Sequence, residues 1–222
     1  MINYSENNII TLVGTIVSER TFSHEVYGEG FYSFNLEVPR LSENSDIIPV
    51  TVSERILSDE FKIGEKVVID GQFRSYNNYE NEKNKLVLTV FVKDIKILTE
   101  DMEIPNPNEI CLTGFICKKP IYRTTPFGRE IADILLAVNR AYNKSDYIPC
   151  IAWGRNARFC QNIEVGEKVK LWGRIQSRTY EKKFEDGTSE IRRAYEVSVS
   201  KMEIERDDAD DVHEEENNVE QN

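Results

Sequence analysis

The stretch Ile63-Gly64-Glu65-Lys66-Val67 occurs a second time, 102 residues further along the chain, as Val165-Gly166-Glu167-Lys168-Val169. The correspondence continues on both sides of this stretch: Gly14 is matched by Gly114 at an offset of 100, and the offset reaches 107 near the end of the second copy. Solenoid repeats are roughly 20–50 residues long, so a period of about 100 residues indicates two copies of one domain.

The composition excludes several classes of protein. A chain of 222 residues is long enough for two small domains that each bury their own core. Its four Cys form no Cys-x-x-Cys pattern and it has only two His, so we expect no metal site, no disulfide framework and no cofactor. Free, buried thiols fit a reducing cytoplasm. The sequence shows neither a signal-peptide pattern nor the apolar run of about 20 residues that a membrane span needs.

The net charge of −11 is divided unevenly along the chain. Residues 1–107 hold 10 Lys and Arg against 18 Asp and Glu, a net charge of −8, whereas residues 108–204 hold 17 against 12, a net charge of +5. Residues 205–222 hold one Arg and nine acids, again a net charge of −8. The acidic chain therefore contains one basic copy, which is suited to a polyanionic partner.

Each copy has the pattern of strands. Between residues 31 and 38, mostly polar side chains alternate with apolar ones, which is typical of a strand with one buried face. In the first copy we predict strands at 9–13, 31–38, 47–52, 66–73 and 86–98, a short helix at 54–61 and a hairpin loop at 77–84. In the second copy we predict strands at 110–119, 129–140, 146–153, 168–180 and 191–204, a short helix near 154–162 and a loop at 181–190.

Five strands with a short helix between the third and the fourth is the order of an OB-fold, a small Greek-key barrel. We therefore predict an all-β chain with two tandem OB-folds and a disordered acidic C-terminal tail. The expected boundaries are 1–100 for a divergent acidic OB-fold, 101–107 for a linker, 108–204 for a basic OB-fold that binds nucleic acid, and 205–222 for the tail.

Four stretches of the second copy form a recognisable set in this order and spacing: Arg123-Thr124-Thr125-Pro126-Phe127-Gly128, Leu136-Ala137-Val138-Asn139-Arg140, Ile148-Pro149-Cys150-Ile151-Ala152-Trp153-Gly154 and Leu171-Trp172-Gly173-Arg174-Ile175-Gln176-Ser177-Arg178-Thr179-Tyr180. Through these stretches the second copy resembles the bacterial single-stranded DNA-binding protein family. The resemblance covers about 97 residues. The first copy resembles the family only through its sibling and its framework of Gly and apolar residues.

A protein that holds a single strand without reading its sequence needs a cationic groove and aromatic faces, each stacked base contributing ~1–3 kcal/mol. The resemblance implies base stacking on Tyr142, Tyr147, Trp153 and Tyr180. Phosphate contacts are expected from basic side chains of the second copy, namely Arg123, Arg129, Arg140, Arg155, Arg158, Arg178, Lys182, Lys183, Arg192 and Arg193. Trp172, beside Gly173, is expected in the core.

The first copy keeps the framework and replaces the contact residues. At the positions that match the aromatic set it has Ser42, Ile47, Ser53 and Asn78. We therefore expect residues 1–107 to bind oligonucleotides far more weakly than residues 108–204 and to serve in pairing or partner binding. A different, weaker contact set remains open for the first copy, made of Phe22, Tyr27, Tyr76 and Tyr79.

The sequence thus predicts a non-enzymatic, cytoplasmic (nucleoid-associated) protein that binds and protects single-stranded DNA in replication, recombination or repair, with no membrane contact. By resemblance, a chain with two OB-folds is expected to form a homodimer. Replication or repair proteins are candidate partners, although the Pro- and Phe-containing tail tip that recruits them in the family is absent from residues 217–222. Two alternatives stay open: an RNA-binding OB-fold protein, and a protein-interaction module without nucleic-acid binding.

Overall fold

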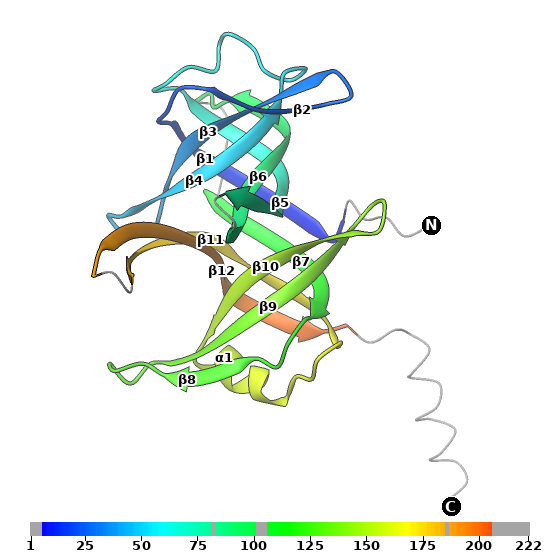
Figure 1. Ribbon diagram of the computed structural model, residues 1–222, viewed down its shortest axis with the longest axis vertical. Helices are drawn as coiled ribbons and strands as arrows, with labels where there is room; N and C mark the ends of the chain where they lie inside the picture. The colour runs from blue at the N-terminus through cyan, green and yellow to red at the C-terminus, as the bar shows by residue number, and fades with distance from the viewer. Residues whose placement is uncertain (1–5, 81–82, 101–105, 185–186, 206–222) are drawn as a thin grey trace, which may run out of the picture.

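The computed structural model describes residues 6–80, 83–100, 106–184 and 187–205 (Figure 1). It confirms an all-β chain of two barrels. The first barrel is built from β1 (Asn8–Ile16), β2 (Thr21–Val26), β3 (Glu29–Pro39), β4 (Ser45–Ser53), β5 (Lys66–Glu80) and β6 (Lys83–Ile97). The second is built from β7 (Asn108–Ile116), β8 (Ile121–Thr124), β9 (Glu130–Arg140), β10 (Lys144–Trp153), α1 (Arg155–Phe159), a 3-10 turn (Cys160–Asn162), β11 (Lys168–Lys183) and β12 (Ser189–Ile204).

Each barrel closes in the same way. β1 pairs with both β3 and β5, and β4 runs parallel to β6; in the second barrel β7 pairs with β9 and β11, and β10 runs parallel to β12. β1 keeps β5 along one edge, and along the other edge its partner changes from β7 to β3 near Gly14; β7 likewise keeps β11 and changes from β1 to β9 near Gly114. A Cβ on Gly14 would collide with the carbonyl oxygen of Glu37, and one on Gly114 with that of Ala137, which explains why both copies have Gly there.

The short helix predicted for both copies forms only in the second copy, as α1, whose Ala157 is buried. In the first copy, residues 54–65 form turns. The hydroxyl oxygens of Ser53 and Ser58 each accept a hydrogen bond from the backbone N–H two residues further on. Ser side chains that bond to nearby backbone groups compete with a helix, which accounts for the wrong prediction.

Two other features differ from the expectation. β2 and β8 were not predicted, because β2 is exposed at all six positions and β8 has no buried residue, so neither shows an in–out alternation. The hairpins are also longer than predicted, since β5 extends to Glu80 and β11 to Lys183. The predicted tail apart from Glu205, and residues 101–105 of the predicted linker, lie outside the described residues. The four domain boundaries stay a prediction.

The two barrels are joined through their first strands. β1 and β7 pair antiparallel with Ile10 opposite Ile110, so all strands form one sheet in the order β2-β3-β4-β6-β5-β1-β7-β11-β12-β10-β9-β8. From the β1–β7 centre outward, both arms present equivalent strands. The repeat in the sequence is therefore a pseudo-twofold in the structure, with the second barrel below the first in Figure 1.

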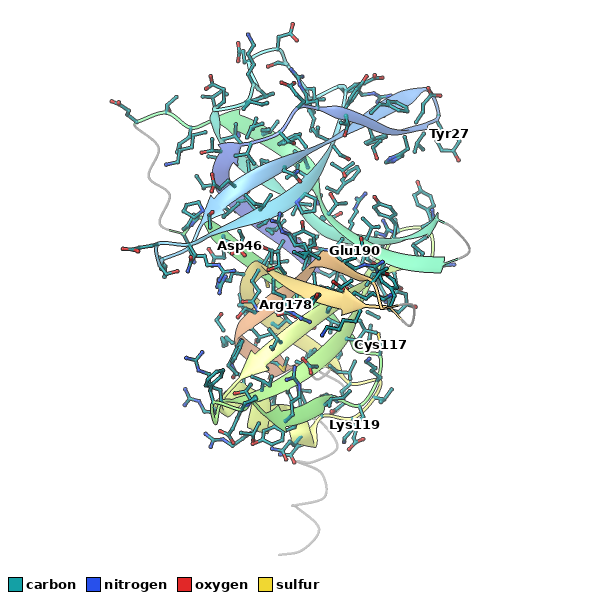
Figure 2. The ribbon with its side chains drawn as sticks, turned by 60° about the vertical axis from the view of Figure 1, so that its left-hand side comes forward. Tyr27, Asp46, Cys117, Lys119, Arg178 and Glu190 are labelled. Atoms are coloured by element: carbon teal, nitrogen blue, oxygen red, sulfur yellow. The ribbon has the colours of Figure 1, made fainter. Side chains whose placement is uncertain are left out.

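Reciprocal hydrogen bonds fix the two barrels against each other. Asp46 of the first barrel accepts hydrogen bonds from the Ser177 N–H at 2.7 Å and from Arg40 Nη2 at 2.6 Å. Asp146 of the second barrel accepts one from the Ser75 N–H at 2.7 Å. Figure 2 shows Asp46 where the barrels meet. Each barrel therefore supplies a buried carboxylate to a strand of the other.

Burial raises the pKa of both carboxyls. At Asp46 the hydrogen bonds from Arg40 and Ser177 outweigh this effect, so its pKa lies below the ordinary value. At Asp146 burial prevails over the bond from Ser75, so its pKa is raised. The two halves of the junction are thus similar in geometry and opposite in their response to pH.

Candidate nucleic-acid interface

Strand register places several predicted contact residues on one outer surface of the second barrel. Tyr147 and Trp153 point to the same side of β10, because side chains alternate along a strand. On that side Ile151 lies beside Ser198 of β12, which in turn lies opposite Arg174 of β11. The predicted contact residues at even spacing from these positions form a surface that we call the outer sheet face: Arg123, Tyr147, Trp153, Arg178, Tyr180, Lys182 and Arg192.

Trp153 ends β10 with its indole on this surface. The side chain is 36% exposed, and Nε1 donates a hydrogen bond to Ser198 Oγ at 3.2 Å. The strand stops there because Gly154 has a φ of 53°, which few other residues adopt readily. The indole is therefore held at one edge with ring surface left for a ligand.

Tyr180 lies between two arginines on the long β11–β12 hairpin. The Arg178 guanidinium is 5.7 Å from its ring centroid, and Arg192 stands directly opposite in the strand register. Phe184, which sequence reasoning left in a loop, continues this arrangement, since Lys182 Nζ is 5.5 Å and Arg192 Cζ 5.8 Å from its ring centroid. Cations over aromatic rings form a surface that stacks bases and attracts phosphates.

Five of the ten predicted phosphate contacts are paired with acids in the structure. Ion pairs join Arg123 to Asp133 at 2.9 Å, Arg140 to Asp146 at 3.2 Å, Arg158 to Glu130 at 3.2 Å, Arg178 to Glu196 at 3.6 Å and Arg192 to Glu190 at 2.8 Å. Exposed pairs contribute only ~0–1 kcal/mol, so an incoming phosphate replaces the acid at small cost. Two pairs are partly buried and are exceptions, because Asp146, the partner of Arg140, has no exposed surface and Glu196, the partner of Arg178, is also buried.

The remaining predicted cations lie away from the outer sheet face. Arg129 lies in the β8–β9 turn, Arg155 and Arg158 on α1, and Lys183 and Arg193 on the opposite side of the β11–β12 hairpin. Their side chains are exposed. They add positive charge around the barrel without adjoining the aromatic rings of the outer sheet face.

Tyr142 does not join the other predicted stacking residues. It lies in the turn between β9 and β10, is 95% exposed, and borders a groove whose other walls come mainly from the first barrel. Arg140 borders the same groove. The structure therefore splits the predicted aromatic set, with Tyr147, Trp153 and Tyr180 on the second barrel and Tyr142 at the junction.

Trp172 is not in the core, contrary to the prediction. Its neighbours Val169 and Leu171 are fully buried, so alternation turns Lys170 and Trp172 outward. The indole lies between two lysines, with Lys201 Nζ 4.2 Å and Lys170 Nζ 5.3 Å from the ring centroid. The adjacent Gly173 suggested burial, but Gly173 is required for the close approach of Ser198 in the bulged β11–β12 pairing.

The described residues hold no cluster of three or more His, Cys, Asp and Glu side chains suited to a metal ion. Cys150 and Cys160 are buried, as expected, and Cys111 and Cys117 are half-buried. Among the described helices none has the length and apolar character that crossing a bilayer requires.

Comparison with known proteins places the chain in a family. A sequence profile described as "Single-strand binding protein family" matches residues 107–205. The single-stranded DNA-binding protein B of Bacillus subtilis (strain 168) is 36% identical over 84 residues, covering 33% of this chain and 72% of that protein. The chain therefore belongs to the single-strand binding protein family.

Single-stranded DNA-binding protein 1 of Staphylococcus aureus (strain COL) is 38% identical over 81 residues, covering 33% of this chain and 48% of that protein. The chain thus spans about half the length of this curated relative. Among solved structures, the wild-type single-stranded DNA binding protein from Thermus aquaticus superposes with a TM-score of 0.72 at 18% identity, over 90% of this chain and 93% of that one. This likeness concerns the fold, and it includes both barrels.

Proposed function

We propose that this protein binds single-stranded DNA through the outer sheet face of its second barrel, with little preference for base sequence and without catalysing a reaction. The single observation that carries the proposal is the register that brings Trp153, Tyr180 and the cations Arg178 and Arg192 onto one surface. Aromatic rings stack any base, because every base has a π-face, and the cations neutralise phosphates. Membership of the family supports DNA as the nucleic acid.

The binding contributes to replication, recombination or repair, in the cytoplasm and close to the nucleoid, and the working unit is a homodimer. Relatives that are named as single-stranded DNA-binding proteins support the binding on which this role depends. Mass measurement in solution tests the second part, and a monomeric mass at micromolar concentration would contradict it.

A titration with oligo-dT tests the central proposal. The two Trp residues should be quenched on binding, and Trp153→Phe should remove more of the quenching than Trp172→Phe. Each phosphate neutralised on a single strand contributes about −0.7 to the slope of log K against log salt, so affinity should fall with rising salt. Tighter binding of a matched RNA oligomer would favour an RNA-binding protein, and no binding to either would favour an interaction module.

A further inference from the structure

The first barrel carries an aromatic and cationic surface that its sequence conceals. In the second barrel, Trp153 of β10 covers Ser198 of the neighbouring strand β12. The strands β4 and β6 occupy the equivalent places in the first barrel. There Ser53 of β4 is equivalent to Trp153, and Phe91 of β6 is equivalent to Ser198, so the aromatic ring lies on the neighbouring strand. When the two sequences are matched position by position, only the loss of Trp is visible, because the aromatic residue of the first copy stands at a different position on the neighbouring strand.

Phe91 is the centre of a stacked array. The Arg74 guanidinium lies 3.7 Å from the Phe91 ring centroid, and Phe31 lies 5.6 Å away. His24 of β2 stacks on Phe31 with centroids 4.9 Å apart and ring planes only 7° from parallel. His24 is exposed, so its outer face is available. A planar guanidinium and an imidazole supported by Phe rings are platforms on which an unstacked base can lie.

This array forms one wall of a groove of about 930 Å³ between the barrels. The opposite wall is the β9–β10 turn of the second barrel, with Arg140, Tyr142 and Lys144. Tyr142 and Asn143 have φ values of 61° and 53°, as residues of tight hairpin turns do. This turn leaves the Tyr142 ring almost fully exposed beside the groove.

The charge in the groove points to an anion. Among the described residues that line the groove, four are Lys or Arg and none is Asp or Glu. The first copy as a whole, in contrast, carries a negative net charge. Burial lowers the pKa of Arg74 to about 10, with a further contribution from Arg140, and burial together with Arg74 lowers the pKa of Lys93. Both groups stay charged at neutral pH. Asp146, which is paired with Arg140, offsets part of this charge, and the groove keeps an excess of cations that favours an anion.

The shape of the groove selects a chain rather than a single nucleotide. A second hollow of about 450 Å³ adjoins the first, since both are lined by His24, Arg74, Phe91 and Arg140. It extends along the outer surface of the first barrel, past Tyr76 and Thr89. An elongated groove with stacking platforms and cations fits several consecutive nucleotides of a single strand.

We propose that one single strand passes over both barrels, and that the first barrel holds it in this composite groove with His24, Arg74, Phe91 and Lys93, completed by Tyr142 from the second barrel. The proposal rests on the proposed function of the second barrel. The proposal replaces the expectation that the first copy serves mainly in pairing or partner binding. It includes two residues of the weaker contact set left open above, because Tyr27 and Tyr76 line the two hollows.

The test uses the full chain with oligo-dT of two lengths, because an OB-fold occupies roughly 4–16 nucleotides: about 8 nucleotides suit one barrel and about 30 reach both. The variants are His24→Ala and Lys93→Ala. Lys96→Ala is the matched control, since Lys96 is an exposed Lys on the same strand β6, paired with Asp94 and outside the groove. Thermal unfolding of each variant establishes that the fold is intact.

For the longer oligomer, His24→Ala and Lys93→Ala should each weaken binding roughly 5- to 150-fold, the range of one lost contact, whereas Lys96→Ala should change it less than about twofold. Photo-crosslinking with 4-thiothymidine in the longer oligomer should mark His24, Phe91 or Tyr142 in addition to the second barrel. Normal affinity of both groove variants, with crosslinks to the outer sheet face alone, would overturn this proposal and leave the proposed function intact. Failure of the unmodified chain to bind oligo-dT would instead refute the proposed function.

Discussion

Replacing Trp153 with Ala separates stacking from charge on the outer sheet face. The indole is 36% exposed and makes one hydrogen bond, at 3.2 Å, to Ser198 Oγ. Loss of one base-stacking contact costs ~1–3 kcal/mol, which is roughly a 5- to 150-fold rise in Kd. Since no charge is removed, the slope of log K against log salt should stay unchanged. The exposed hydrogen bond contributes only ~0.5–1.5 kcal/mol to the free energy of unfolding, so the fold should persist.

The measurement is the anisotropy of a labelled oligo-dT, which does not depend on Trp fluorescence, at several salt concentrations. Phe159→Ala is the matched control, because Phe159 is an aromatic residue with a similar exposed fraction, 37%, and lies on α1 away from the outer sheet face. The reasoning is refuted if Trp153→Ala binds within twofold of the unmodified chain. Unfolding of the variant would show that the indole is a core residue.

Three further predictions concern charge. Arg178→Ala should reduce the magnitude of the slope of log K against log salt by about 0.7, the value of one phosphate contact. Lys119→Ala is the control and should leave the slope unchanged, because Lys119 is paired with Glu164 and lies at a distant site in Figure 2. Equal slopes for the two variants would refute the role of Arg178. Asp46→Asn should lower the free energy of unfolding at pH 7 by about 1.5–3 kcal/mol, the value of a hydrogen bond to a charged group, and by more than Asp146→Asn. The reason is that the pKa of Asp46 is lowered in the folded chain, so its ionised form stabilises the fold above the unfolded pKa of about 4, whereas the pKa of Asp146 is raised. This contribution is lost as the pH falls through the folded pKa, so the difference in the free energy of unfolding between Asp46→Asn and the unmodified chain should be smaller at pH 3 than at pH 7. A constant difference in chemical denaturation would contradict the assignment. Deleting residues 207–222, which carry eight acids and no Lys or Arg, should tighten oligo-dT binding at low salt and have little effect at high salt, where the Debye length is short; unchanged low-salt affinity would show that the segment does not compete for the cations.

The sequence by itself determined the repeat, the β class and most of the strand positions. These follow from local rules: alternation marks a strand with one buried face, and Gly14 and Gly114 mark the place where a backbone approaches too closely for a Cβ. Trp153 and Tyr180 were predicted as surface contacts and lie on the surface. Local rules failed where there was no alternation to read, as in the fully exposed β2.

Only the tertiary structure decided which side chains share a surface. Alternation alone allows Trp172 to point either into the barrel or outward. The burial of Val169 and Leu171 turns it outward, so the prediction of a core residue was wrong. Tyr142 belongs to the second copy in the sequence and borders the first barrel in space, because the β1–β7 pairing brings the barrels together. The aromatic array around Phe91 arises in the same way, since residues of four strands become neighbours only when a barrel closes. Contacts between strands depend on register over long sequence separations, and no local pattern encodes that register.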